Sequence, residues 1–129
     1  MRNLLLVGGG GFLGSVARYL LGGLVLHATG APRFPLATLA VNVTGCLAIG
    51  VLAGFAEKAH LFSPASRLFL ITGFLGGYTT FSAFAYETFF LAREHAWVSA
   101  VANVLAQVAV GLAAVYFGYR LAVVVVMNA

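Results

Sequence analysis

The residues best suited to do chemistry lie in one glycine-rich stretch, GFLGGYTTFSAF at positions 73–84. Its paired glycines and adjacent threonines are poor formers of a continuous helix. A helix that breaks inside a protein leaves backbone carbonyl and amide groups free, and such groups are ready ligands for ions. Phe81 and Phe84 lie three residues apart and share one helical face, and Thr80 and Ser82 add hydroxyl groups. This stretch alone favours equally an ion site and a packed kink whose phenylalanines are filler.

A polar amide in a second apolar stretch favours the ion site. Asn42 ends the sequence TLAVN, inside a long apolar run. A polar residue at such a position usually faces the interior of a helix bundle, where it marks a pathway or makes a packing hydrogen bond. The amide N–H groups and the positive edges of Phe81 and Phe84 would suit a small, hard anion. Fluoride must exchange a tightly held water shell for donors, and weak donors also permit release.

Four apolar stretches must position these residues. The chain has 129 residues, of which 62% are hydrophobic and 8% charged, whereas soluble domains carry about 25% charged residues. About 20 apolar residues suffice to cross a bilayer, and such spans must be helical to satisfy their backbone groups. We predict one all-α membrane domain, residues 1–129, whose four transmembrane helices cover roughly 4–26, 36–56, 68–92 and 97–119, with the third helix broken.

The first 17 residues resemble a signal peptide, because Arg2 precedes an apolar run that ends in small residues. The apolar pattern resumes directly after Arg18, so we expect a continuing span rather than a removed leader.

Positive charge is almost evenly divided between the two expected sides of the membrane. Four spans put both termini on one side, with the cations Arg2, Lys58, Arg67 and Arg120. The other side holds Arg33 and Arg93, and also Arg18 if that residue faces it. An excess of Lys and Arg normally sets the orientation, so this near balance predicts insertion in both directions. Pairing of the two orientations gives an antiparallel dual-topology homodimer.

Glycines spaced four residues apart support close helix contacts, either within the chain or between two chains. The pairs are Gly10 and Gly14, Gly50 and Gly54, and Gly73 and Gly77.

Three segments together resemble the Fluc/CrcB family of fluoride channels: the stretch from Gly9-Gly10 to Arg18-Tyr19, TLAVN at 38–42, and above all GFLGGYTTFSAF at 73–84. The resemblance covers essentially the whole chain. It implies a multi-pass protein of the bacterial inner membrane, an antiparallel homodimer with two separate pores that exports fluoride passively from the cytoplasm and confers fluoride resistance. It also implies a structural Na⁺ at the dimer centre.

The same resemblance assigns expected roles to the motif residues. Asn42 would be the amide donor of the pore, and Phe81 and Phe84 would be its aromatic residues, with each pore drawing phenylalanines from both subunits. The backbone carbonyls of Gly76 and Thr79 would hold Na⁺, two from each subunit, which fits the preference of hard cations for oxygen ligands.

Further polar residues are expected along the path. Thr80 and Ser82 would contribute hydroxyl groups, and Arg18 would lie in a vestibule and attract anions.

The fourth stretch departs from the family, because Asn103 and Gln107 occupy the region where members often present hydroxyl groups. These two amides lie four residues apart on one expected helical face and would line the pore, or else join helices inside the bundle. The role of Glu87 stays open.

Other kinds of function are not favoured by the sequence. Residues 9–14 fit G-x-G-x-x-G, yet no acid precedes Glu57, so the acid that a dinucleotide site needs about 20 residues later is missing. The net charge of +4 is scattered rather than gathered into a basic run, so we expect no nucleic-acid partner. His27, His60 and His95 are all expected in connecting loops without a nucleophile beside them, so we expect no enzyme.

Two alternative functions remain. A small dual-topology multidrug/proton antiporter would couple transport through a carboxylate in its first span, but residues 4–26 contain no Asp or Glu. A non-transporting membrane subunit would use the same polar residues only to bind helices together, and it would carry no ion by itself.

Overall fold

The computed structural model describes residues 1–30, 33–59 and 61–128, and within these ranges it contains helices and turns but no strand. Four rods follow one another along the chain. The first two are the single helices α1 (Arg2–Thr29) and α2 (Leu36–Lys58). The third consists of α3 (Pro64–Arg67), the π-helical segment η1 (Leu68–Leu75), α4 (Gly76–Tyr78) and α5 (Phe81–Arg93). The fourth consists of α6 (Trp97–Leu105), the π-helical segment η2 (Ala106–Val110) and α7 (Gly111–Met127).

Each rod is long and apolar enough to cross a membrane, which confirms the predicted all-α fold of four long apolar helices. Large apolar side chains are exposed along the rods, among them Leu4, Phe12 and Val98. Because lipid is as apolar as these side chains, their exposure is what a membrane-embedded helix requires.

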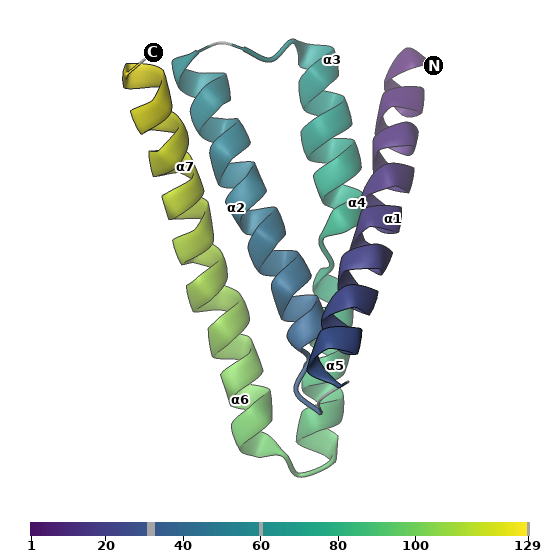
Figure 1. The fold of residues 1–129 in the computed structure, drawn as a ribbon. Coiled ribbons are helices and arrows are strands. Elements are labelled where there is room, and N and C mark those ends of the chain that lie inside the picture. The colour runs from purple at the N-terminus through teal and green to yellow at the C-terminus, as the bar shows by residue number, and fades with distance from the viewer. Residues whose placement is uncertain (31–32, 60, 129) are drawn as a thin grey trace.

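The rods are arranged so that both termini lie at the same end of the molecule, and the turn between α5 and α6 lies at the opposite end (Figure 1). α2 packs along α7, and α1 packs along η1 and α4. Arg33, ahead of α2, forms an ion pair with Glu94, just after α5, at 2.5 Å. This pair joins two connections at the end of the bundle that faces away from the termini.

Close approach of α1 to the third rod depends on glycines. A Cβ atom built on Gly10 would lie 2.8 Å from the backbone nitrogen of Phe74, and one built on Gly73 would lie 2.9 Å from the carbonyl oxygen of Val7. Gly14 and Gly77 make equally close backbone contacts across the same two rods. There is therefore no room for a larger side chain at these positions.

Glycines also allow α2 to approach α7 closely. A Cβ atom on Gly50 would lie 3.0 Å from the backbone nitrogen of Tyr119, and one on Gly54 would lie 2.9 Å from the carbonyl oxygen of the same residue. All three glycine pairs found in the sequence thus make contacts within one chain, which was one of the two expected uses.

The histidines differ in part from the expectation that all of them lie in loops. His27 lies in the last turn of α1, because the helix continues to Thr29 and ends only at Gly30, whose φ of 69° suits glycine. His95 lies in the turn between α5 and α6. His60 lies outside the described residues.

Candidate functional site

The site is built around two residues with extended backbone between α4 and α5. Thr79 has φ −81° and ψ 161°, and Thr80 has φ −149° and ψ 115°. Threonine is β-branched and tolerates this geometry well. The N–H and the hydroxyl group of Thr79 both donate to the carbonyl of Leu75, at 3.0 and 2.9 Å. On the other side, the Thr80 hydroxyl accepts the N–H of Ala83 at 3.2 Å and so caps α5.

Asn42 on α2 holds this extended segment from the side. The N–H of Thr80 donates to Asn42 Oδ1 at 2.9 Å, and Asn42 Nδ2 donates to the carbonyl of Thr80 at 3.0 Å. Asn42 Nδ2 also donates to Oε1 of Gln107, at 3.0 Å. One side chain therefore connects α2, the Thr79–Thr80 segment and η2.

These hydrogen bonds leave two carbonyl groups without their helical donors. In a continuous α-helix, the carbonyl of Gly76 would accept from the N–H of Thr80, and that of Thr79 would accept from the N–H of Ala83. Both N–H groups donate to side chains instead. The Thr79 carbonyl accepts a hydrogen bond from Arg18 Nη1 at 3.4 Å. The two oxygens expected to hold Na⁺ are thus among the carbonyl oxygens that the extended segment leaves without helical donors.

A cavity of about 440 Å³ lies beside this segment, and most of the expected site residues line it. They are Asn42, Gly76, Thr79, Thr80, Phe81, Phe84 and Gln107. The rings of Phe81 and Phe84 meet edge to face, with centroids 5.4 Å apart and an interplanar angle of 65°. We call this space the aromatic cavity. Two amide side chains and two phenylalanine rings thus lie in its wall, and amide N–H groups and the edges of aromatic rings interact favourably with anions.

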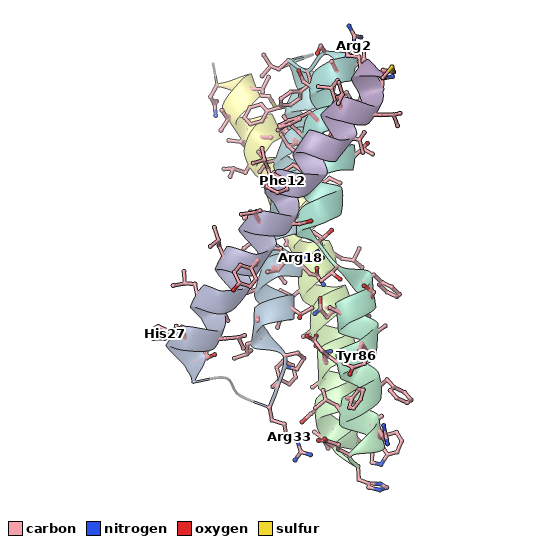
Figure 2. All side chains as sticks on the ribbon, turned by 90° about the vertical axis from the view of Figure 1, so that its right-hand side faces the viewer. Arg2, Phe12, Arg18, His27, Arg33 and Tyr86 are labelled. Carbon is pink, nitrogen blue, oxygen red and sulfur yellow. The ribbon has the colours of Figure 1, made fainter. Side chains whose placement is uncertain are left out.

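A second cavity, of about 370 Å³, is lined by two further expected site residues, the cation Arg18 and the hydroxyl-bearing Ser82. We call it the arginine cavity. Arg18, Thr38 and Ser82 lie in its wall, and Thr80 belongs to the walls of both cavities. Figure 2 shows Arg18 near the middle of α1, between Arg2 at one end and His27 at the other. Thr80 is therefore the point at which the two cavities adjoin.

A family model described as CrcB-like protein, Camphor Resistance (CrcB), matches residues 5–119. This chain belongs to the CrcB family. Three curated relatives carry the name Fluoride-specific ion channel FluC. The relative from Methylobacillus flagellatus is 47% identical over 94% of both chains. The relative from Solibacter usitatus is 49% identical over 95% of this chain and 98% of its own. The relative from Rhizobium meliloti is 49% identical over 94% of this chain and 96% of its own.

In this CrcB chain, the two amides of the fourth rod have different surroundings. Gln107 lies in the wall of the aromatic cavity, whereas Asn103 lies in the wall of neither cavity described above. Asn103 is fully buried and donates to the Thr88 hydroxyl at 2.8 Å, which in turn donates to the carbonyl of Phe84 at 2.8 Å. The π-helical pattern of η2 begins between the two amides and changes the rotation of the chain there. Asn103 thus joins α6 to α5 in this structure, and its expected place in the pore stays a prediction.

One polar pair of the CrcB chain was not among the expected site residues. The Thr38 hydroxyl donates to Oε1 of Glu87 at 2.6 Å, which ties α2 to α5. The other carboxylate oxygen, Oε2, is buried and has no hydrogen-bond partner. The available signal was the position of Thr38, four residues before Asn42 and so on the same face of α2. That spacing does not reveal which residue of α5 lies opposite.

Proposed function

We propose that this chain is a fluoride-selective ion channel of the bacterial inner membrane, which lets fluoride leave the cytoplasm passively and so confers fluoride resistance. The membership in the CrcB family and the relatives named Fluoride-specific ion channel FluC support this function. The observation that carries it is the aromatic cavity. Two amides and two phenylalanine rings meet in its wall, and no acid is among its lining residues.

The chemistry of the two cavities supports a path for an anion. The positive charge of Arg18 raises the local concentration of anions in the arginine cavity. From there, an anion passes Thr80 into the aromatic cavity, where N–H groups and ring edges replace part of its water shell. Neutral, weakly polar contacts compensate dehydration without holding the ion tightly, so exit remains fast.

We further propose that two chains of opposite orientation form an antiparallel homodimer with two pores, and that each pore uses phenylalanines from both subunits. Phe81 is 79% exposed in the single chain, although it lines the aromatic cavity. A second chain that covered this cavity would bring its own rings against the first pair. The near balance of cations across the two ends of the bundle favours the mixed insertion that such a dimer needs.

The extended segment between α4 and α5 would also provide a binding site for a cation. We propose that the carbonyl groups of Gly76 and Thr79 hold a structural Na⁺, with the same two groups from the partner subunit completing the oxygen ligands. Their loss of helical donors to Asn42 and to the cap of α5 supports this role. Bound there, Na⁺ would supply a positive charge that draws the interrupted segments of both subunits together.

Neither alternative function gains support. A proton-coupled antiporter needs a membrane carboxylate in its first span, and α1 has no acidic residue. A non-transporting subunit would not explain why this chain is similar, over nearly their whole length, to relatives that carry the name of a channel.

Growth in fluoride tests the proposed function. In a bacterium that lacks its own fluoride export, we expect the wild-type chain to restore growth in fluoride-containing medium. Phe84→Ile, present in the membrane at the same level, should not restore it. Absence of rescue by wild-type protein that is present in the membrane would contradict the proposal.

A further inference from the structure

The direction of the hydrogen bonds around Asn42 determines which amide in the aromatic cavity can still donate. A backbone N–H can only donate, so the bond from the N–H of Thr80 requires Asn42 to present Oδ1 there. The NH₂ group of Asn42 is then directed at two acceptors, the carbonyl of Thr80 and Oε1 of Gln107. An inverted Asn42 would oppose donor to donor and oxygen to oxygen. Its orientation is therefore fixed by the backbone.

Both N–H groups of Asn42 are consumed by these two bonds, since an amide nitrogen carries two hydrogens. Gln107 is in the opposite situation. Its oxygen accepts from Asn42, and its nitrogen Nε2 is buried without a hydrogen-bond partner. A buried donor without a partner is unfavourable and rare in proteins. Of the two amide side chains that line the aromatic cavity, only that of Gln107 therefore keeps a donor without a partner.

The chain of bonds also strengthens this donor. An amide whose oxygen accepts a hydrogen bond becomes a better donor through its nitrogen, because the two ends polarise each other. Asn42 is polarised by Thr80, and Gln107 is polarised by Asn42. The same cavity wall contains the rings of Phe81 and Phe84.

We propose that the Nε2 group of Gln107 is the direct amide ligand of the permeating anion, and that Asn42 is a positioning residue that orients Gln107. This inference rests on the proposed fluoride channel and specifies the division of labour at that site. It differs from the expectation drawn from the family resemblance, in which Asn42 itself donates to the ion.

Gln107 is the sole glutamine in the sequence, which makes a direct observation possible. In detergent-solubilised protein with ¹⁵N in the glutamine side chain, one NH₂ signal is expected. We expect fluoride to shift this signal in a saturable manner and chloride to leave it in place. In a second sample with ¹⁵N in the asparagine side chains, the signal of Asn103, which donates to Thr88 away from the cavity, is the control and should not move.

Flux measurements test the same ligand by a second route. Gln107→Met keeps a similar volume without a donor, and Gln107→Glu keeps the acceptor for Asn42 but repels anions. Both should lower fluoride efflux from vesicles at least tenfold while the protein elutes as wild type. Leu105→Met, an exposed residue two positions earlier on α6, should conduct as wild type.

The positioning role of Asn42 has its own readout. In Asn42→Ala, the fluoride concentration that half-saturates the glutamine shift should rise at least tenfold. An unchanged half-saturation would refute the positioning role. Fluoride efflux from wild-type vesicles with no movement of the glutamine signal, or wild-type efflux by Gln107→Met, would refute the ligand role. Wild-type vesicles that release no fluoride would instead defeat the proposed function itself.

Discussion

At the scale of single residues, the bonds of Asn42 explain why so many of the expected site residues meet. Its position inside an apolar run indicated a buried polar role, and that much follows from the cost of placing an amide in lipid. Its partners could not be predicted, because Thr80 and Gln107 are 38 and 65 residues away. Sequence spacing reports neighbours on one helix and says nothing of which neighbouring helix supplies the acceptor.

The two phenylalanines provide the first prediction. Phe81→Ile and Phe84→Ile replace a ring edge by an aliphatic group that offers no positive edge to an anion. We expect each change to lower fluoride efflux from vesicles about tenfold or more, equivalent to about 1.4 kcal/mol in the barrier. Phe89→Ile, an exposed phenylalanine on the same helix that lies in neither cavity wall, is the matched control. Full transport by both variants, present in the membrane at the wild-type level, would contradict this role of the rings.

At the scale of elements, the four rods were predictable because the bilayer imposes both a length and an apolar composition. The residues at which the helices begin and end were less predictable. The fourth rod continues to Met127 through the apolar residues 121–127 that follow Arg120, and the third begins at Pro64, four residues before the apolar stretch. The segments η1 and η2 had no signal in the sequence, because a π-helical turn depends on how neighbouring elements pack.

Neighbouring glycines of α1 give a prediction about this packing. In Gly10→Ala, the new Cβ atom would meet the backbone of the third rod, with the nitrogen of Phe74 at 2.8 Å. We expect the free energy of unfolding to fall by about 1–3 kcal/mol. In Gly9→Ala, the Cβ atom meets nothing within 4 Å, and the better helix propensity of alanine should raise stability by up to about 1 kcal/mol. Unfolding curves in detergent measure both, and equal stability of the two variants would contradict the close approach of α1 to η1.

At the scale of the whole molecule, the balance of positive charge is the property on which an antiparallel dimer depends. Four cations lie toward the end of the bundle that holds the termini, Arg33 and Arg93 lie toward the other end, and Arg18 lies near the middle of α1. A few substitutions can therefore determine the orientation of the entire chain. Both termini lie at the same end (Figure 1), so each substitution near a terminus acts on the same side of the membrane.

Charge variants test the antiparallel arrangement. Arg2→Gln, Arg67→Gln and Arg120→Gln together leave one cation on the side of the termini against two or three on the other, and should favour one orientation. Arg93→Gln leaves four against one or two and should favour the other. We expect each variant alone to lose at least about nine-tenths of fluoride resistance, and co-expression of the two to restore it, because only the mixture supplies both orientations. Arg2→Lys, Arg67→Lys and Arg120→Lys together preserve the charge and should behave as wild type. Full activity of each biased variant on its own would contradict the antiparallel dimer.

The most direct test of a fluoride-selective path is paired efflux of fluoride and chloride from vesicles that contain the purified wild-type chain and no other protein. The aromatic cavity, with two amides, two phenylalanine rings and no acid in its wall, predicts rapid fluoride release and chloride retention at the level of empty vesicles. Equal release of both anions, or retention of both, would contradict a fluoride-selective path through this chain.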